Sequence, residues 1–159
     1  MPATRFYYGD PGPWPEPNRP LRVAVIALIT RASDGALLLE QRRDNGQWGP
    51  IGGGVDPYET PEQALTREVA EETGLTVVAH RLVGVMAGPS NVIAYPDGNV
   101  FREVALIYAV DVAEGPVRIS EEAQVLRYVP RDEVLALELA SPARFKLEQI
   151  LAGVDFIVG

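Results

Sequence analysis

The stretch from Gly52 to Leu75 reads GGGVDPYETPEQALTREVAEETGL, and the interpretation of the whole chain starts from it. Thr60 is a favourable N-cap, the proline after it suits the first helical position, and Gln63 completes a capping box with Thr60. Gly74 is the residue type preferred just past a helix end, where the backbone turns left-handed. We therefore predict a helix over Pro61–Thr73.

Three carboxylates share one face of this predicted helix. Glu68, Glu71 and Glu72 stand at positions i, i+3 and i+4, so they repel one another by a few tenths of a kcal/mol per pair. They also lie near the C-terminal end, where the helix dipole disfavours anions. A solvated acidic face is the usual outcome of such a run. Converging carboxylates, however, are the hard oxygen ligands that Mg²⁺ or Mn²⁺ prefers, and such ions bridge to substrate phosphates.

Strand patterns surround this helix on both sides. Leu21–Ile29 is a continuous apolar, β-branched run, which predicts a strand buried on both faces. The turn at residues 33–35 predicts that Ala36–Gln41 returns beside it as a hairpin. The remaining expected elements are a glycine-rich loop over Asn45–Gly54, strands over Leu75–Met86, Val100–Val112 and Gln124–Val129, and one or two helices over Arg131–Ala152, interrupted at Ser141-Pro142. The expected fold is a mixed-sheet α/β domain.

The first 20 residues differ from the rest of the chain. Trp14 and three other aromatic residues lie close to five prolines, at positions 11, 13, 15, 17 and 20, which predicts an extended arm that forms neither helix nor central strand. This arm is either a poorly ordered tail or a segment whose aromatic side chains pack on the body, on a dimer partner or over a ligand. Residues 21–159 are expected to form the single domain, since domains most often have ~100–150 residues.

Composition excludes several classes of protein. The chain has 159 residues, 22 acidic and 14 basic side chains, and a net charge of −8, which argues against stable binding to nucleic acid. It contains no cysteine, so disulfides, thiolate zinc sites and cysteine nucleophiles are absent. The longest apolar run, Val23–Ile29, is shorter than the ~20 residues of a membrane helix, and residues 1–20 do not read as a secretory signal. We expect a cytoplasmic protein without membrane partners.

The quoted stretch resembles the Nudix box at every defined position from Gly53 to Leu75. The matching residues are Gly53, Glu59, Arg67-Glu68-Val69, Glu71-Glu72 and Gly74-Leu75, in that spacing. The resemblance implies a Nudix hydrolase with an α/β/α sandwich around a mixed sheet. Such enzymes hydrolyse a nucleoside diphosphate linked to another moiety.

The resemblance also assigns roles to residues of this chain. It implies that Glu68, Glu71, Glu72 and the Gly52 carbonyl bind Mg²⁺, with Mn²⁺ as an alternative. Glu71, Glu72 and a late acid, Glu122, are the candidate catalytic residues; Glu121 and Glu103 are alternatives to Glu122. Gly53, Glu59, Arg67 and Gly74 are expected to support the site, with Glu59 and Arg67 forming an ion pair that ties the glycine-rich loop to the helix.

The substrate stays open at this stage. ADP-ribose-like compounds and nucleoside triphosphates, oxidised ones included, are the candidates, and Arg42, Arg43 and Arg102 are candidates to hold a phosphate. His80, the only histidine, is expected to have a surface or packing role.

Two other functions are weighed against hydrolysis. A Nudix-type isomerase of isoprenoid diphosphates would be expected to use a cysteine, which this chain lacks. A non-catalytic nucleotide-binding or regulatory module has usually lost the acidic residues that bind the metal, whereas all three of these glutamates are present here. The aromatic arm and the tail Val154–Val158 also raise the possibility of a homodimer.

Overall fold

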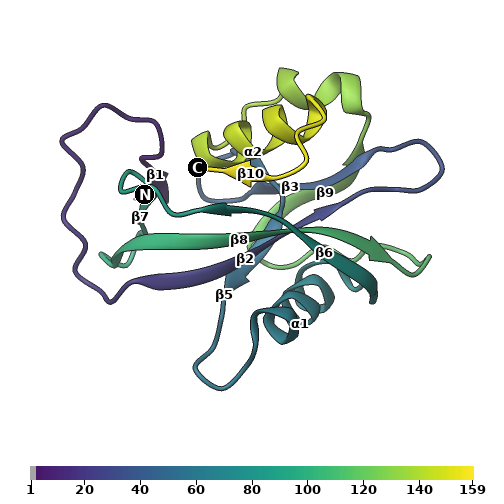
Figure 1. Cartoon of the computed structure of the whole chain (residues 1–159), viewed down its shortest axis with the longest axis horizontal. Coiled ribbons are helices and arrows are strands. Elements are labelled where there is room, and N and C mark those ends of the chain that lie inside the picture. Colours follow the sequence, from purple (N-terminus) through teal and green to yellow (C-terminus); the bar gives the residue numbers. More distant parts are fainter. Residues whose placement is uncertain (1–2) are drawn as a thin grey trace.

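A mixed β-sheet lies between two helices in the computed structural model, which describes residues 3–159 (Figure 1). Strand β2 (Arg22–Ile29) is central: it runs parallel to β8 (Val100–Val112) and antiparallel to β5 (Ile51–Gly54). On the far side of β8 lies β6 (Val77–Met86), antiparallel to it. The shorter members of the sheet are β1 (Arg5–Phe6), β7 (Val92–Ala94) and β10 (Ile157–Val158).

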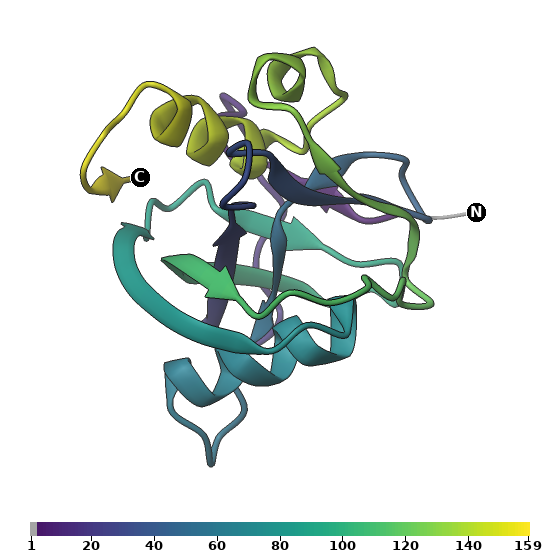
Figure 2. The ribbon, with the colours of Figure 1, turned by 90° about the vertical axis from the view of Figure 1, so that its right-hand side faces the viewer.

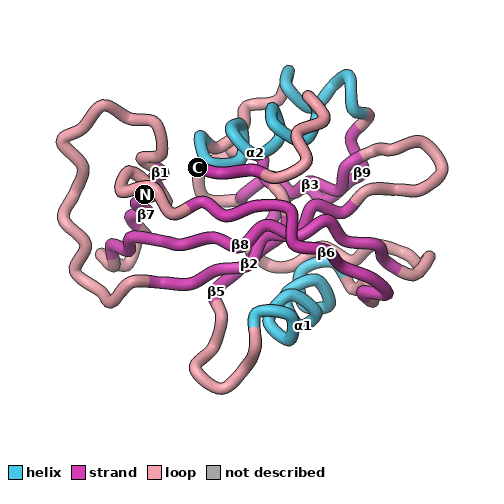
Figure 3. Tube along the Cα trace, viewed as in Figure 1, coloured by secondary structure: helices cyan, strands magenta, loops and turns pink. Residues whose placement is uncertain are grey.

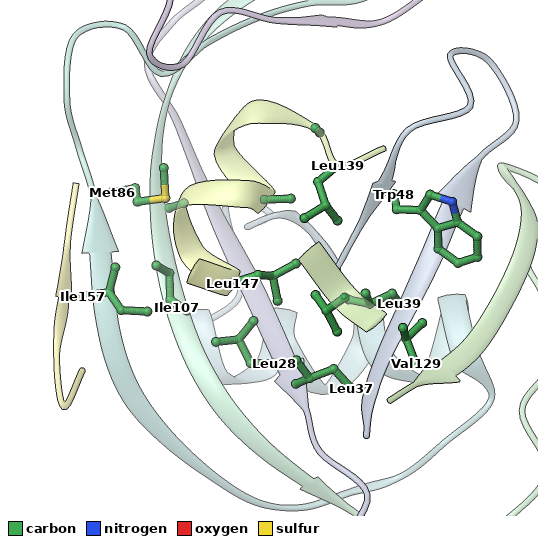
Figure 4. Packing of buried hydrophobic residues seen from close by; sticks show 14 of the residues in the cluster. Leu28, Leu37, Leu39, Trp48, Met86, Ile107, Val129, Leu139, Leu147 and Ile157 are labelled. Atoms are coloured by element: carbon green, nitrogen blue, oxygen red, sulfur yellow. The ribbon is translucent and has the colours of Figure 1, made fainter. Parts of the chain in front are cut away.

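The two faces of this sheet are covered by different helices, as the view in Figure 2 also shows. Helix α1 (Pro61–Thr73) packs on the face that carries Val25, Ala27 and Ile29 of β2. Helix α2 (Ser141–Leu151) covers the other face through Ala143 and Leu147, and Figure 4 shows Leu147 in this cluster. The prediction that this strand is buried on both faces is therefore confirmed, and so is the expected α/β/α sandwich.

The predicted hairpin is only partly present, because its returning strand belongs to a second, smaller sheet. Strand β3 (Leu37–Arg42) forms one isolated bridge, from Leu37 to Thr30 just after β2. It then pairs antiparallel with β9 (Ala123–Val129) and β4 (Trp48–Gly49). The chain does reverse at the expected turn, where the Arg31 N–H donates to the Ala36 carbonyl. The hairpin does not continue because β5 and β8 already occupy both edges of β2.

The glycine-rich loop predicted over Asn45–Gly54 is wrong at two places, since residues 48–49 form strand β4 and residues 51–54 form a further strand. Residues 51–54 form strand β5, which pairs with residues 24–27 of β2. Glycine permits this close approach: a Cβ on Gly52 would lie 2.4 Å from the Val25 carbonyl oxygen. The end of the predicted loop is therefore the edge strand beside the acidic helix.

The helices follow the local sequence signals (Figure 3). Helix α1 spans the predicted residues, with Thr60 and Gln63 in a reciprocal capping box and Gly74 left-handed at φ 74°. The expected interruption near Ser141 is also present, because a 3₁₀ helix, η1 (Arg131–Ala136), precedes α2. No helix in the described part of the chain has the length and apolar character needed to cross a membrane.

Segments near both ends of the described residues pack on the body of the protein. Phe6 pairs with Ile93 of β7, and the rings of Tyr8 and Phe145 lie 5.2 Å apart, so aromatic residues of the arm pack on the body. At the other end, Ile157 is fully buried beside Gly84 of β6. The C-terminal tail thus packs its central apolar side chain within its own chain.

Candidate active site

A cleft of about 1040 Å³ opens at the end of the sheet where β5 faces α1. Its walls come from β3, β5, α1 and the loop before β9. The glutamates that line it are Glu40, Glu68, Glu71, Glu72, Glu121 and Glu122. The cleft therefore gathers the three box carboxylates and the late acids that the sequence singled out.

Two glycines bring the strand backbone against the acidic helix. A Cβ on Gly53 would lie 2.3 Å from the carboxyl carbon of Glu68, so only glycine leaves room for that carboxylate. The Gly52 N–H donates to a carboxylate oxygen of Glu72 at 3.3 Å. The backbone of residues 52–53 thus contacts two carboxylates of α1.

Negative charge is crowded there. Burial raises the pKa of Glu72, and the charges of Glu40 and Glu68 raise it further. The pKa of Glu40 is also raised, mainly by burial, against the lowering influence of Arg42. Buried carboxyl groups that repel one another in this way are stabilised by a cation placed between them.

Arg67 holds the base of the cleft together. Its guanidinium donates to Glu59 at 3.1 Å, to the Gly54 carbonyl at 3.1 Å and to Glu68 at 2.8 Å. The ion pair with Glu59 is the one expected from the sequence. The contacts with Glu68 and Glu71 are additional, so Arg67 offsets part of the charge on the acidic face, which sequence reasoning missed.

The donor set fits a hard divalent cation, although the carboxylates are not already gathered around a single point. Within residues 3–159, no three Asp, Glu, His or Cys side chains lie close enough together to form a metal-binding group. Glu68 is largely buried against Arg67, whereas the side chain of Glu71 is 60% exposed. The oxygen-only chemistry and the crowded charge nevertheless match Mg²⁺ or Mn²⁺.

The candidate phosphate-binding arginines occupy different environments. Arg42 and Arg43 line the cleft; Arg42 pairs with Asp44, while Arg43 donates to the carbonyls of Glu121 and Ala123. Arg102 does not line the cleft, which corrects its assignment, and it donates to the Ala87 carbonyl instead.

Two residues of the site were not identified from the sequence. Glu40 lies on β3 and Arg22 on β2, so neither belongs to the acidic helix or its loop. Arg22 donates to the Tyr95 hydroxyl at 2.7 Å and lies 3.4 Å from Glu103. The one available signal in the sequence was a charged residue at the end of an apolar strand. That signal does not identify a site residue, because only the pairing of distant strands brings Glu40 and Arg22 to the cleft.

The candidate late acids also separate in space. Glu121 and Glu122 both line the cleft and are exposed, whereas Glu103 is 7% exposed and faces an inner cavity. His80 lies outside the cleft, with its ring against the edge of Tyr108, in agreement with a packing role.

Comparison with known proteins identifies the family. A NUDIX domain model matches residues 20–150. A MutT-like protein of Streptomyces ambofaciens is 35% identical over 72% of this chain and 68% of its own length. The nucleoside triphosphatase NudI of Klebsiella pneumoniae is 33% identical over 65% of this chain and 76% of its own. An ADP-ribose pyrophosphatase of Methanocaldococcus jannaschii is 33% identical over 64% of this chain and 57% of its own.

A solved structure extends the likeness to three dimensions. The MutT NUDIX hydrolase of Burkholderia pseudomallei superposes with a TM-score of 0.68 at 31% identity, over 83% of this chain and 99% of that one. The residues 20–150 matched by the family model include the acidic helix and the glycine strand described above. The chain therefore belongs to the Nudix hydrolase family.

Proposed function

We propose that this protein hydrolyses the diphosphate bond of a nucleotide with the help of Mg²⁺ or Mn²⁺. The observation that carries the proposal is the crowding of Glu40, Glu68 and Glu72 against the glycines of β5, since a cation relieves that repulsion. We assign Glu68, Glu71, Glu72 and the Gly52 carbonyl as metal ligands. The bound ion would neutralise the diphosphate and acidify a water molecule.

The chain's own residues have distinct tasks in this reaction. Glu122 takes the proton from the attacking water, because it lies on the exposed wall of the cleft that faces solvent. Arg42 holds a phosphate, while Arg43 positions the acidic loop by donating to two of its carbonyls. Glu59 and Arg67 fix the glycine strand to α1.

The substrate classes to test follow from the relatives. One relative is named a nucleoside triphosphatase and another an ADP-ribose pyrophosphatase, so both classes belong in a substrate panel. We place nucleoside triphosphates, oxidised ones included, first, with ADP-ribose-like compounds second. NADH and diadenosine polyphosphates complete the panel.

The decisive experiment measures hydrolysis of this panel with Mg²⁺, with Mn²⁺ and with EDTA, and identifies the products by chromatography and ³¹P NMR. We expect at least one substrate to be cleaved only when metal is present. Activity that resists EDTA, or no cleavage of any compound, would contradict the proposal.

Two variants separate the assigned roles. Glu122→Gln should lower kcat by about 10²- to 10⁴-fold, the usual range for loss of a general base. Glu121→Gln is the matched control, since it removes a neighbouring charge from the same cleft wall. An equal loss of kcat in both variants would show that the reaction depends on the negative charge of the loop and not on Glu122 as the base.

The non-catalytic alternative has its own test. In Glu71→Gln, loss of metal-dependent phosphate release with retained nucleotide binding would exclude a purely binding or regulatory module. If the unaltered protein binds nucleotides but releases no phosphate, that alternative is correct.

A further inference from the structure

The N-terminal arm contributes one side chain to the wall of the cleft. Thr4 lines the cleft, although the family model matches residues 20–150 and so does not include the arm. The next two residues of the arm form β1, which pairs with β7 of the large sheet (Figure 1). Thr4 itself contacts the turn that follows β3, a strand of the second sheet. The arm therefore joins the two sheets at this wall of the cleft.

Every polar group of Thr4 takes part in this contact. Its N–H and its hydroxyl donate to the same carboxylate oxygen of Asp44, at 3.0 Å and 2.6 Å. Its carbonyl accepts from the side-chain amide of Asn45 at 3.0 Å, and its hydroxyl accepts from Nη2 of Arg42 at 2.9 Å. Thr4 is 2% exposed, so water does not compete for these bonds. The hydroxyl is donor and acceptor at once, and it bridges Asp44 and Arg42.

The contacts fix two of the three nitrogens of the Arg42 guanidinium. Nε donates to Asp44 at 2.9 Å, and the two N–H groups of Nη2 donate to Thr4 and Asp44 at 2.9 Å and 3.1 Å. The guanidinium carbon also lies 5.8 Å from the centre of the Phe6 ring, which is a further contact with the arm. Nη1 donates to no group within residues 3–159. Its two N–H groups are therefore the ones left for a ligand in the cleft.

Arg42 has competing partners nearby. The carboxylates of Glu40 and Glu122 line the same cleft and attract any mobile cation in it. A long arginine side chain that is not held would turn toward such carboxylates, and its donors would then be occupied. Fixing the guanidinium before the substrate arrives prevents this competition. It also reduces the conformational entropy that is lost when a phosphate binds.

We propose that Thr4 is a positioning residue for substrate binding, which holds Arg42 so that Nη1 donates to a phosphate oxygen. Thr4 does not touch the substrate, because both roles of its hydroxyl are already used by Asp44 and Arg42. The inference rests on the proposed function, in which Arg42 holds a phosphate. It gives the N-terminal arm a task in the reaction that the matched family region does not supply.

A binding measurement tests the hydroxyl without depending on catalysis. Thr4→Val removes the hydroxyl at nearly the same shape, whereas Thr4→Ser retains it. Calorimetric titration with inorganic pyrophosphate and Mg²⁺ should give a Kd about tenfold weaker for Thr4→Val, within the range for a hydrogen bond to a charged group. Thr4→Ser should bind like the unaltered protein.

The matched control is Thr76→Val, the same change at an exposed threonine that does not line the cleft. It should leave the pyrophosphate Kd unchanged. The proposal would be overturned by an unchanged Kd in Thr4→Val, by an equal loss in Thr4→Ser, or by failure of the unaltered protein to bind pyrophosphate.

A double-mutant cycle separates action through Arg42 from general loosening of the arm. Arg42→Ala should itself weaken pyrophosphate binding, and Thr4→Val should have no further effect in the Arg42→Ala protein, because the hydroxyl acts through the guanidinium. Additive effects of the two changes would refute the positioning role. Circular dichroism of each variant verifies that it folds.

Steady-state kinetics connect the contact to turnover. With whichever compound of the substrate panel is cleaved, Thr4→Val should raise KM about tenfold and leave kcat nearly unchanged, because the contact to the phosphate is the same in the ground state and the transition state. A lower kcat at unchanged KM would contradict the proposal.

These results stay distinguishable from failure of the proposed function. Metal-dependent hydrolysis together with pyrophosphate binding that does not depend on Thr4 would refute the positioning role and leave the hydrolase assignment intact. Pyrophosphate binding that depends on Thr4 through Arg42, without hydrolysis of any compound, would support the positioning role and refute the catalytic proposal.

Discussion

At the scale of single residues, the most informative side chains are those whose charge is buried. Lys146 and Glu103 occupy a cavity in which neither forms a hydrogen bond within residues 3–159. Glu72 and Glu40 likewise share a buried part of the cleft and repel each other. Glu103 has Arg22 at 3.4 Å as an ion-pair partner, whereas Lys146 has no ion-pair partner among residues 3–159, and buried charge of this kind costs stability.

Lys146 leads to a pH prediction. Its pKa in the folded protein is about 8, below the ordinary value of about 10.4, so between these limits the unfolded chain binds more protons. Stability therefore rises with pH through this window, as the buried ammonium loses its charge. Below pH 8 the full penalty of roughly 3 kcal/mol applies, by the usual conversion of pKa shifts.

Urea unfolding of the protein and of Lys146→Met, from pH 7 to pH 10, measures this effect. Comparing the two cancels other titrations, such as that of Tyr95, whose pKa burial raises. We expect Lys146→Met to be the more stable protein at pH 7 and its advantage to shrink as pH rises. An advantage that does not change with pH would contradict an ionised buried lysine.

At the scale of elements, the decisive contact is that between strand β5 and helix α1. Local signals alone place α1, since the Thr60 and Gln63 capping box and the left-handed Gly74 stand at the predicted positions. What brings the Glu68 carboxylate to the backbone is the pairing of β5 with β2, together with the missing side chain of Gly53.

Gly53→Ala tests this contact. The added Cβ would meet the end of the flexible Glu68 side chain, so the fold should survive, with a change in stability below about 1 kcal/mol. The displaced carboxylate should weaken Mn²⁺ binding by about tenfold or more, the range seen when supporting groups of a metal site change. Calorimetric titration with Mn²⁺ measures this.

The matched control is Gly115→Ala. A Cβ there would make only an ordinary contact, 3.8 Å from Leu75, in a loop that does not line the cleft. Unchanged Mn²⁺ affinity in Gly53→Ala would show that the position of Glu68 is unimportant for binding.

At the scale of the whole molecule, the C-terminal tail adds strand β10 to the edge of the sheet beside β6. Ile157 is fully buried, and a Cβ on Gly84 would lie 2.7 Å from it, so β10 and β6 fit together closely. Phe156 and Val158 stay exposed. The proposed homodimer therefore has these two side chains and the exposed part of the arm available, but not Ile157.

Ile157→Ala should destabilise the protein by roughly 3 kcal/mol, the range for truncating a buried isoleucine. Val158→Ala, at a side chain that is 75% exposed, should change stability by less than about 0.5 kcal/mol. Thermal unfolding at several protein concentrations shows whether Ile157 stabilises a single chain or a dimer. A Tm that does not change with concentration places the Ile157 contact within one chain. Light scattering tests the dimer itself, and a monomer at all concentrations would refute it.

The sequence by itself determined the acidic helix, its ends, the doubly buried central strand and the family resemblance. These depend on capping, periodicity and spacing over a few turns of chain, which are local properties. Tertiary structure alone decided that residues 51–54 form a strand and that β3 joins a second sheet. It also brought Arg22, Glu40 and Lys146 beside the glycine strand, because strand pairing and helix packing join residues whose separation in the chain carries no local signal.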